Sequence, residues 1–179
     1  MNGMMDESKL IDMCLKHDPR AQKMLFDKFA PKMLSVCLRY MKNTEKAEDV
    51  LQDGFVKIFG KLKEFKREGS FEGWVRRIMV NTSLDALRKN EKTKYDQSID
   101  DVSYKLEYND PNATSLEVED LLALVKQMPT GYRIVFNMFA IEGYSHKEIA
   151  EKLQISENTS KSQYMRARAY LRERLDKLK

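Results

Sequence analysis

The chain has 179 residues, of which 42% are hydrophobic and 34% are charged. That much apolar material can form one ordinary domain or two small ones, and it excludes a disordered chain. Seven glycines and four prolines are few, which disfavours a turn-rich all-β fold. The N-terminus is acidic, and no run of about eighteen apolar residues occurs, so neither a signal peptide nor a transmembrane helix is expected. We therefore expect a cytoplasmic protein that does not insert into a membrane.

Charge is distributed unevenly along the chain. In total, 32 basic and 28 acidic residues give a net charge of +4. Residues 1–90 carry a net charge of +5 and residues 114–179 carry +2, whereas residues 91–113 carry −3. Basic helices suit a polyanion such as nucleic acid, although two merely solvated helix faces would have the same charge.

Apolar residues recur at helical spacing through most of the first ninety residues. The predicted helices cover residues 19–40, 44–62 and 71–89. Asp18 and Ser70 are candidate N-caps of the first and third helices, and Pro31 is expected to kink or interrupt the first. The second helix has one apolar stripe and an opposite face that is acidic in its N-terminal half, where the helix dipole favours acidic residues.

Helical periodicity stops between residues 91 and 113. This stretch is polar and acidic and ends in Asn109-Asp110-Pro111-Asn112, so we interpret it as a flexible linker. The sequence therefore predicts one domain over residues 1–90 and another over residues 114–179.

Helical patterns resume after the linker. Capping boxes of the form Ser/Thr-x-x-Glu begin at Thr114 and Ser145, and Gly143 is a natural end for the helix before the second box. Ser156 is a candidate cap for a last helix that is basic up to the end of the sequence. Because no strand is predicted, the expected fold class is all-α, with two small helical domains.

The last two predicted helices form a helix-turn-helix, since a short helix is followed by a tight turn and a capped basic helix. One stripe of the last helix is expected to face inward: Ser160, Tyr164, Ala167 and Leu171. The opposite stripe carries polar and basic side chains that can donate hydrogen bonds to phosphates and base edges in a major groove, together with the apolar Met165 and Ala169. The donors on this stripe are Asn158, Lys161, Ser162 and Arg166. An ordinary helical hairpin with a solvated face is the alternative.

Four stretches of the chain together resemble the bacterial RNA polymerase sigma factors of the extracytoplasmic-function (ECF) group. Residues 47–55 (AEDVLQDGF) are similar to the helix that docks on the clamp coiled coil of the largest polymerase subunit. Residues 70–78 (SFEGWVRRI), with Asn81, Asp85 and Arg88, are similar to the promoter-melting helix. Residues 144–150 and 159–168 resemble the two helices of the region-four helix-turn-helix.

The resemblance implies a transcription initiation factor that binds core RNA polymerase, reads the −35 duplex and melts the −10 element. In such a factor, residues 1–90 would be region two, residues 91–113 the linker through the polymerase channels, and residues 114–179 region four. An anti-sigma factor would be a further partner. No catalytic residue, metal, cofactor or small-molecule substrate is implied.

The resemblance also assigns site residues. Polymerase binding is assigned to Glu48, Asp49, Gln52, Asp53 and Val56. Contacts with the −10 element are assigned to Phe65, Lys66, Arg67, Ser70, Phe71, Arg76, Arg77, Asn81 and Arg88. Contacts with the −35 element are assigned to Asn158, Lys161, Ser162, Met165, Arg166 and Arg168. Trp74 lies on the apolar stripe of its helix and is expected in the core rather than as a stacking platform for bases.

Two residues depart from the pattern of the family. Gln154 stands where the turn commonly has glycine, so a left-handed backbone there would cost about 1 kcal/mol. Ser160 stands where valine is common, and its hydroxyl is expected to bond to a carbonyl one turn earlier.

An enzyme and a dimeric DNA-binding regulator are the two alternatives to this resemblance. An enzyme would have to use Glu48, Asp49 and Asp53, which have no accompanying histidine cluster or glycine-rich loop. His17 and His146 are isolated and are expected at the surface or in caps, whereas Cys14 and Cys37 are expected to be buried. A dimeric helix-turn-helix regulator that binds operators is the main alternative, but such a regulator would leave the acidic helix of residues 44–62 without a role.

Overall fold

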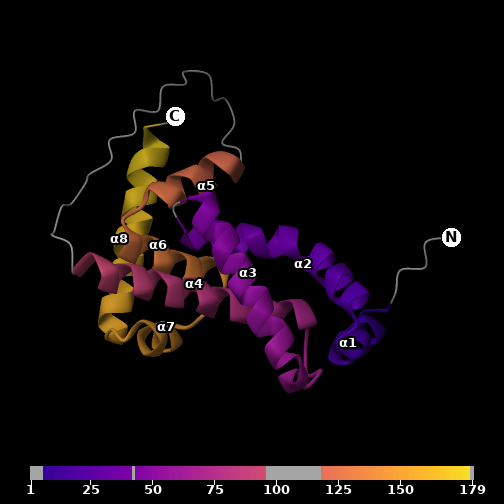
Figure 1. Cartoon of the computed structure of the whole chain (residues 1–179). Coiled ribbons are helices and arrows are strands. Elements are labelled where there is room, and N and C mark those ends of the chain that lie inside the picture. Colours follow the sequence, from indigo (N-terminus) through magenta and orange to yellow (C-terminus); the bar gives the residue numbers. More distant parts are fainter. Residues whose placement is uncertain (1–5, 42, 96–117, 178–179) are drawn as a thin grey trace. The chain divides into compact units, whose positions relative to one another are not determined.

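The computed structural model describes residues 6–41, 43–95 and 118–177, and within these ranges it contains helices but no strands. The all-α prediction is therefore confirmed. The chain divides into two compact units, Met1–Ile99 and Asp100–Lys179, whose helices are labelled in Figure 1. Most of the predicted linker and the predicted cap at Thr114 lie outside the described residues. None of the described helices combines the length and the apolar content needed to cross a bilayer.

The first unit contains α1 (Glu7–Leu15), α2 (Pro19–Tyr40), α3 (Thr44–Lys61), the short 3-10 helix η1 (Leu62–Glu64) and α4 (Phe71–Tyr95). Helices α2, α3 and α4 pack against one another, and α1 packs on α2 and η1. Their core is built from fully buried side chains that include Leu25, Met33, Val36, Tyr40, Ile58 and Val75. Cys14 and Cys37 are both buried, as predicted, and burial raises the pKa of the Cys37 thiol to about 11.

Helix α2 begins where the sequence predicts. The Asp18 carboxylate accepts hydrogen bonds from the backbone N–H groups of Arg20 at 2.8 Å and Ala21 at 3.2 Å. Of the two effects predicted for Pro31, a kink or an interruption, the interruption is wrong, because α2 continues through that residue to Tyr40. Pro31 lies on the exposed side of α2, where the carbonyl that loses its N–H partner can be hydrated, while buried residues before and after it hold the helix on the core.

Helix α4 is longer than the predicted 71–89, since it extends to Tyr95. The six added residues contain neither glycine nor proline, so no local signal stops the helix at residue 89.

Gly54 lies at a close contact between α3 and α4. A Cβ atom at this position would overlap Sδ of Met79 and lie 2.7 Å from its Cε, and Met79 is fully buried. Gly54→Ala should therefore lower the free energy of unfolding by about 1–2 kcal/mol, because overpacking outweighs the gain in helix propensity. At Gly60, also on α3, a Cβ would meet nothing within 4 Å. Gly60→Ala should raise the same free energy by about 0.5 kcal/mol. Urea denaturation of both variants tests this, and a change of the same sign in both would contradict the packing argument.

The second unit contains α5 (Val118–Gln127), α6 (Thr130–Phe136), the π-helical turn η2 (Asn137–Ile141), α7 (His146–Leu153) and α8 (Glu157–Asp176). Helix α8 packs against α5, α6 and α7. One cluster of its core joins Val125 and Met128 to Ala167 and Leu171. Gly143, with a φ of +76°, ends the segment before α7 as predicted. The capping box at Ser145 is complete, since both reciprocal hydrogen bonds with Glu148 form.

Candidate functional site

Helix α3 presents an acidic face to solvent. The helix starts at the cap Asn43, whose side chain accepts a hydrogen bond from the backbone N–H of Lys46 at 2.9 Å. Its buried stripe packs into the unit and includes Ala47, Val50 and Phe55. All five residues assigned to polymerase binding are exposed on α3: Glu48, Asp49, Gln52, Asp53 and Val56. Val56 is 72% exposed, so this face carries an exposed apolar side chain beside its carboxylates.

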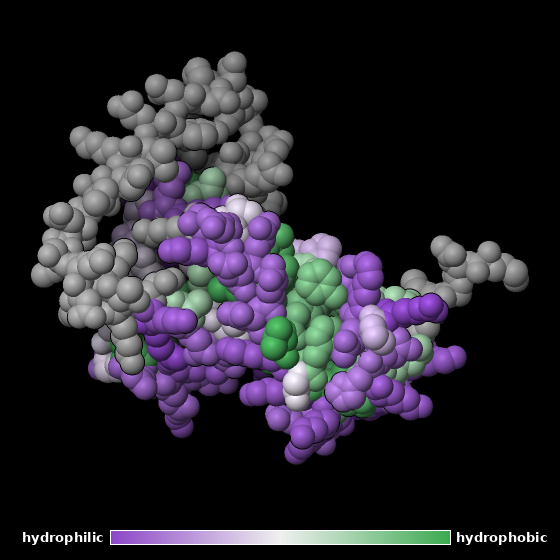
Figure 2. All heavy atoms as spheres, in the orientation of Figure 1, coloured by the Kyte–Doolittle hydropathy of each residue, from purple (hydrophilic) through white to green (hydrophobic). Residues whose placement is uncertain are grey.

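The acidic face borders an apolar groove between α2 and α3. The groove has a volume of about 550 Å³ and is lined by Phe26, Asp27, Ala30, Pro31, Leu34, Glu48, Leu51 and Gln52. Figure 2 shows hydrophobic side chains between hydrophilic ones on the face that carries these two helices. This groove was not predicted from the sequence. Its signal was the spacing of four between Phe26, Ala30 and Leu34, which forms a second apolar stripe on α2.

The loop between η1 and α4 forms one side of a second pocket. Ser70 caps α4 as predicted, because its hydroxyl accepts a hydrogen bond from the backbone N–H of Gly73 at 3.3 Å. The pocket has a volume of about 380 Å³ and is lined by Glu64, Phe65, Lys66, Glu68, Gly69, Ser70, Gly73, Trp74 and Arg77. The structure thus brings four of the residues assigned to the −10 element to one pocket: Phe65, Lys66, Ser70 and Arg77.

Aromatic rings build the wall of this pocket. Phe65, Phe71 and Trp74 lie within 5.7 Å of one another between ring centroids, and Phe29 packs edge-on against Phe71. Phe71 is only 2% exposed, so its place is beneath the pocket, where it supports the other two rings. The core position expected for Trp74 is only partly right. Its ring stacks on Phe71, but the side chain is half-buried and lines the pocket.

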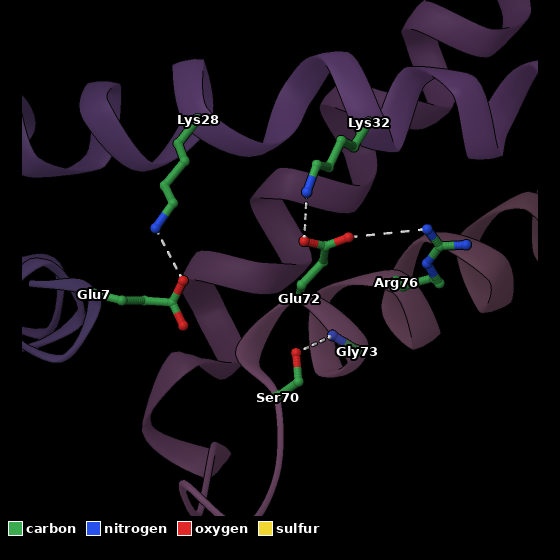
Figure 3. A network of polar contacts seen from close by, with 7 residues as sticks. All are labelled: Glu7, Lys28, Lys32, Ser70, Glu72, Gly73 and Arg76. Atoms are coloured by element: carbon green, nitrogen blue, oxygen red, sulfur yellow. Dashed lines mark hydrogen bonds and ion pairs between the residues drawn. The ribbon is translucent and has the colours of Figure 1, made fainter. Parts of the chain in front are cut away.

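A network of charged residues ties the start of α4 to α2. Figure 3 shows the Glu72 carboxylate between Lys32, whose Nζ lies at 2.8 Å, and Arg76, whose guanidinium lies at 4.0 Å. Further along, Glu7 of α1 pairs with Lys28 of α2 at 3.0 Å. Arg76, which is assigned to the −10 element, therefore shares a carboxylate with α2 in the free protein.

The Glu72 network should make stability depend on pH. The hydrogen bond from Lys32, helped by nearby positive charges, holds the pKa of Glu72 below its ordinary value of 4.5. Ionised Glu72 therefore stabilises the fold above the unfolded-state pKa, and this contribution is lost as the pH falls through the folded-state pKa. Glu72→Gln should lower the urea midpoint at about pH 6, and its difference from wild type should shrink at lower pH.

The control for that experiment is Lys32→Gln, which removes the main cause of the pKa shift. In a Lys32→Gln background, the added change Glu72→Gln should have little effect at any pH. If the difference in urea midpoint between wild type and Glu72→Gln stayed constant with pH, the stabilising role of ionised Glu72 would be contradicted.

Charged residues on the rest of α4 also have partners. Asp85 accepts from Arg88 at 3.1 Å and from Lys57 of α3 at 3.2 Å. Asn81 and Arg77 are exposed on α4. Arg67 lies apart from these residues, since its guanidinium bonds to Ser8 and Asp12 of α1.

In the second unit, the two predicted stripes of α8 are confirmed as an inner and an outer face. Ser160, Ala167 and Leu171 are buried, and Tyr164 is half-buried. The six residues assigned to the −35 element are all exposed: Asn158, Lys161, Ser162, Met165, Arg166 and Arg168. Ser156 caps α8 by accepting from the backbone N–H of Thr159 at 3.0 Å. Lys161 also pairs with Glu157 at 2.8 Å.

The contact between α7 and α8 differs from the prediction. Ser160 does not rely on its own helix for a partner, because its hydroxyl lies 2.9 Å from Nδ1 of His146. His146 is not an isolated surface residue either, since its ring stacks on Phe139 with centroids 4.3 Å apart. Gln154 adopts the left-handed backbone expected for the turn, with a φ of 55°. A side-chain hydrogen bond therefore helps fix α8 on α7.

None of the described residues forms a group of three or more His, Cys, Asp or Glu side chains that could hold a metal ion.

Two family models match the chain, one in each unit. The model of sigma-70 region 2 matches residues 25–93, which include α3 and the pocket loop. The model of sigma-70 region 4 matches residues 119–171, which include α7 and most of α8. Together the two matches cover more than half of the chain. The chain belongs to the sigma-70 family of RNA polymerase sigma factors.

Relatives of this sigma factor include named ECF sigma factors, the group that the sequence predicts. It is 29% identical over 153 residues to the ECF RNA polymerase sigma factor SigE of Mycolicibacterium smegmatis, a match that covers 83% of this chain and 59% of SigE. It is 27% identical over 178 residues to the ECF RNA polymerase sigma factor SigW of Bacillus subtilis, and this match covers 93% of this chain and 95% of SigW. Its fold resembles that of the sigma factor RpoE from Bartonella quintana, with a TM-score of 0.56 and 23% identity over 86% of this chain and 96% of RpoE.

The prediction of a transcription initiation factor is thereby confirmed. The sigma factor binds core RNA polymerase and promoter DNA, and the alternative of a dimeric operator-binding regulator is not favoured.

Proposed function

We propose that this sigma factor uses three separate surfaces to start transcription. The acidic face of α3 and the adjoining groove dock on core RNA polymerase, the pocket beside α4 captures an unpaired base of the −10 element, and α8 reads the −35 duplex. The observation that carries the proposal is the exposed face of α3, which gathers Glu48, Asp49, Gln52, Asp53 and Val56 beside an apolar groove.

The α3 surface combines the two features of a protein-docking patch. Asp49 and Asp53 lie one turn apart and supply negative charge that can steer a basic partner surface into register. Val56 and the groove supply apolar area that becomes buried on binding. Charge therefore directs the encounter, and burial of apolar area holds the complex.

The pocket beside α4 suits a base that has left the DNA stack. Phe65 and Trp74 offer aromatic surface for stacking, and Lys66 and Arg77 can hold the phosphates on either side of the base. Base stacking on an aromatic side chain is worth about 1–3 kcal/mol, which helps to offset the loss of pairing when the strands separate.

Helix α8 has the side chains that read a major groove. Lys161 and Arg166 can donate to guanine, and the 64% exposed side chain of Met165 can contact a thymine methyl group. Asn158 and Arg168 are exposed on the same helix, and their proposed contacts are with the DNA backbone.

A protein inhibitor is a further partner in this proposal. The structurally similar RpoE was solved in complex with the anti-sigma factor NepR. In this chain, the groove between α2 and α3 offers apolar surface that such an inhibitor could cover in place of polymerase. The proposed place of action is the bacterial cytoplasm, where core polymerase resides, and no catalytic step by this chain is proposed.

Run-off transcription with sigma-free bacterial core polymerase tests the function. The template is promoter-bearing DNA from the genome that encodes this protein. Discrete transcripts that appear only when the protein is added would support the proposal. No binding to polymerase, together with tight binding of the protein alone to duplex DNA, would overturn it.

A further inference from the structure

Arg67 lies in the loop that forms the base pocket, yet its side chain points elsewhere. Lys66 and Glu68, its neighbours on either side, both line the pocket, whereas Arg67 is not among the described residues that do. Its guanidinium instead donates hydrogen bonds to the Ser8 hydroxyl and the Asp12 carboxylate, which both belong to α1. The loop is therefore attached to a helix that lies more than fifty residues away in the sequence.

The backbone at Arg67 is in a conformation that arginine disfavours. Its φ of 60° lies in the left-handed region, where a side chain other than that of glycine clashes with the backbone. Such a conformation persists only where the surrounding structure enforces it. The bonds of its guanidinium to Ser8 and Asp12 are contacts that can help to hold it here. Gly69, with a φ of 93°, is a second left-handed residue in this loop, and Lys66 and Glu68 on either side of Arg67 line the pocket.

Helix α1 is firm enough to act as a support. Leu10, Ile11 and Cys14 are at most 3% exposed, so α1 is packed into the unit. Glu7 also pairs with Lys28 of α2, as Figure 3 shows. Both Ser8 and Asp12 lie on α1 and are spaced by one turn, so they approach Arg67 from the same side.

We propose that Ser8 and Asp12 position the loop of the −10 pocket through Arg67. Arg67 is then a positioning residue rather than the DNA contact that the family resemblance assigns. This inference rests on the proposed function, in which the pocket captures a base of the −10 element. It extends the promoter-melting machinery to α1, a helix that precedes the region matched by the region 2 model.

The attachment should matter for promoter opening more than for overall stability. The side chains of Arg67 and Asp12 are 44% and 56% exposed, and ion pairs at such exposure contribute little to the free energy of unfolding. Without the attachment, however, Arg67 can return to the backbone conformation that arginine prefers, and the pocket loses its shape.

Two measurements on the full chain test the proposal. Hydrogen exchange reports how well the loop amides of residues 66–69 are held. Permanganate reactivity of −10 thymines reports open complexes formed by the reconstituted holoenzyme on a promoter fragment found by run-off transcription. Asp12→Ala should speed exchange in the loop and reduce open complexes about fivefold or more. Glu7→Ala removes the exposed ion pair of α1 with Lys28 but leaves Leu10, Ile11 and Cys14 buried, so it should change neither.

Substitutions at Arg67 separate positioning from DNA binding. Arg67→Gly should keep more open complexes than Arg67→Ala, because glycine adopts the left-handed backbone without support. Adding Asp12→Ala to Arg67→Gly should cause no further loss, since the two residues act together. The proposal would be overturned if Arg67→Gly and Arg67→Ala lost open complexes equally and if both also reduced the salt dependence of promoter binding by the amount expected for about one phosphate contact.

The pocket-lining variant Lys66→Ala distinguishes this inference from the proposed function. If Lys66→Ala impairs opening but Asp12→Ala does not, the pocket proposal stands and the role of α1 is overturned. If both variants open the promoter like wild type, both proposals are overturned.

Discussion

Charge reversal at Asp49 and Asp53 is expected to weaken the binding of core RNA polymerase about hundredfold or more, because like charges that face each other across an interface cost several kcal/mol. Both side chains are exposed on α3. The double variant Asp49→Lys/Asp53→Lys should therefore fold normally, with a free energy of unfolding within about 0.5 kcal/mol of wild type. Titration of the labelled protein with core polymerase measures the affinity.

The matched control for this experiment is Glu151→Lys/Glu173→Lys. It changes the net charge of the chain by the same amount, but on exposed positions of α7 and α8 in the second unit. It should bind core polymerase with the affinity of wild type. If the control and the α3 variant lose affinity equally, net charge rather than the acidic face governs docking, and the proposed surface is wrong.

Arg166→Ala is expected to cause the largest loss of −35 recognition among single substitutions on α8. Arg166 is exposed, and no ion pair is recorded for it within the described part of the second unit. A bidentate contact from arginine to guanine contributes about 1–3 kcal/mol of discrimination, so affinity for the promoter should fall about tenfold to hundredfold. Specificity at one base pair of the −35 element should relax at the same time.

Two arginines on the same helix provide the comparison. Arg168→Ala should weaken binding to all sequences alike and lower the salt dependence by about one contact, because Arg168 is assigned to a phosphate. Arg172→Ala, which no promoter contact involves in this proposal, should have little effect. Binding of the reconstituted holoenzyme to promoter fragments with altered −35 bases measures all three. Equal losses for Arg166→Ala and Arg172→Ala would contradict the proposed orientation of α8.

Features that depend on neighbouring residues could be predicted from the sequence. The cap at Asp18 and the capping box at Ser145 each follow from a few adjacent residues, and both are present. The left-handed backbone at Gln154 is also present, but that expectation comes from the family resemblance. Amphipathic spacing likewise predicted which face of α3 and α8 is exposed.

Features that depend on contacts between distant segments could not be predicted. The partner of the Ser160 hydroxyl is His146, fourteen residues away on another helix, and no local pattern pairs them. Arg67 joins Asp12 across 55 residues. Trp74 belongs to an apolar stripe, but whether such a ring is covered depends on the loop in front of it. At Pro31, local preference predicts a break in α2, but tertiary packing keeps the helix continuous.

Several of the cations assigned to promoter DNA already have carboxylate partners in the free protein: Arg76 with Glu72, Arg88 with Asp85, and Lys161 with Glu157. A DNA phosphate that binds such a cation has to displace a carboxylate, which reduces the gain from counterion release that drives non-specific association. Non-specific binding of this chain to duplex DNA should therefore be weaker than its number of exposed basic side chains alone predicts.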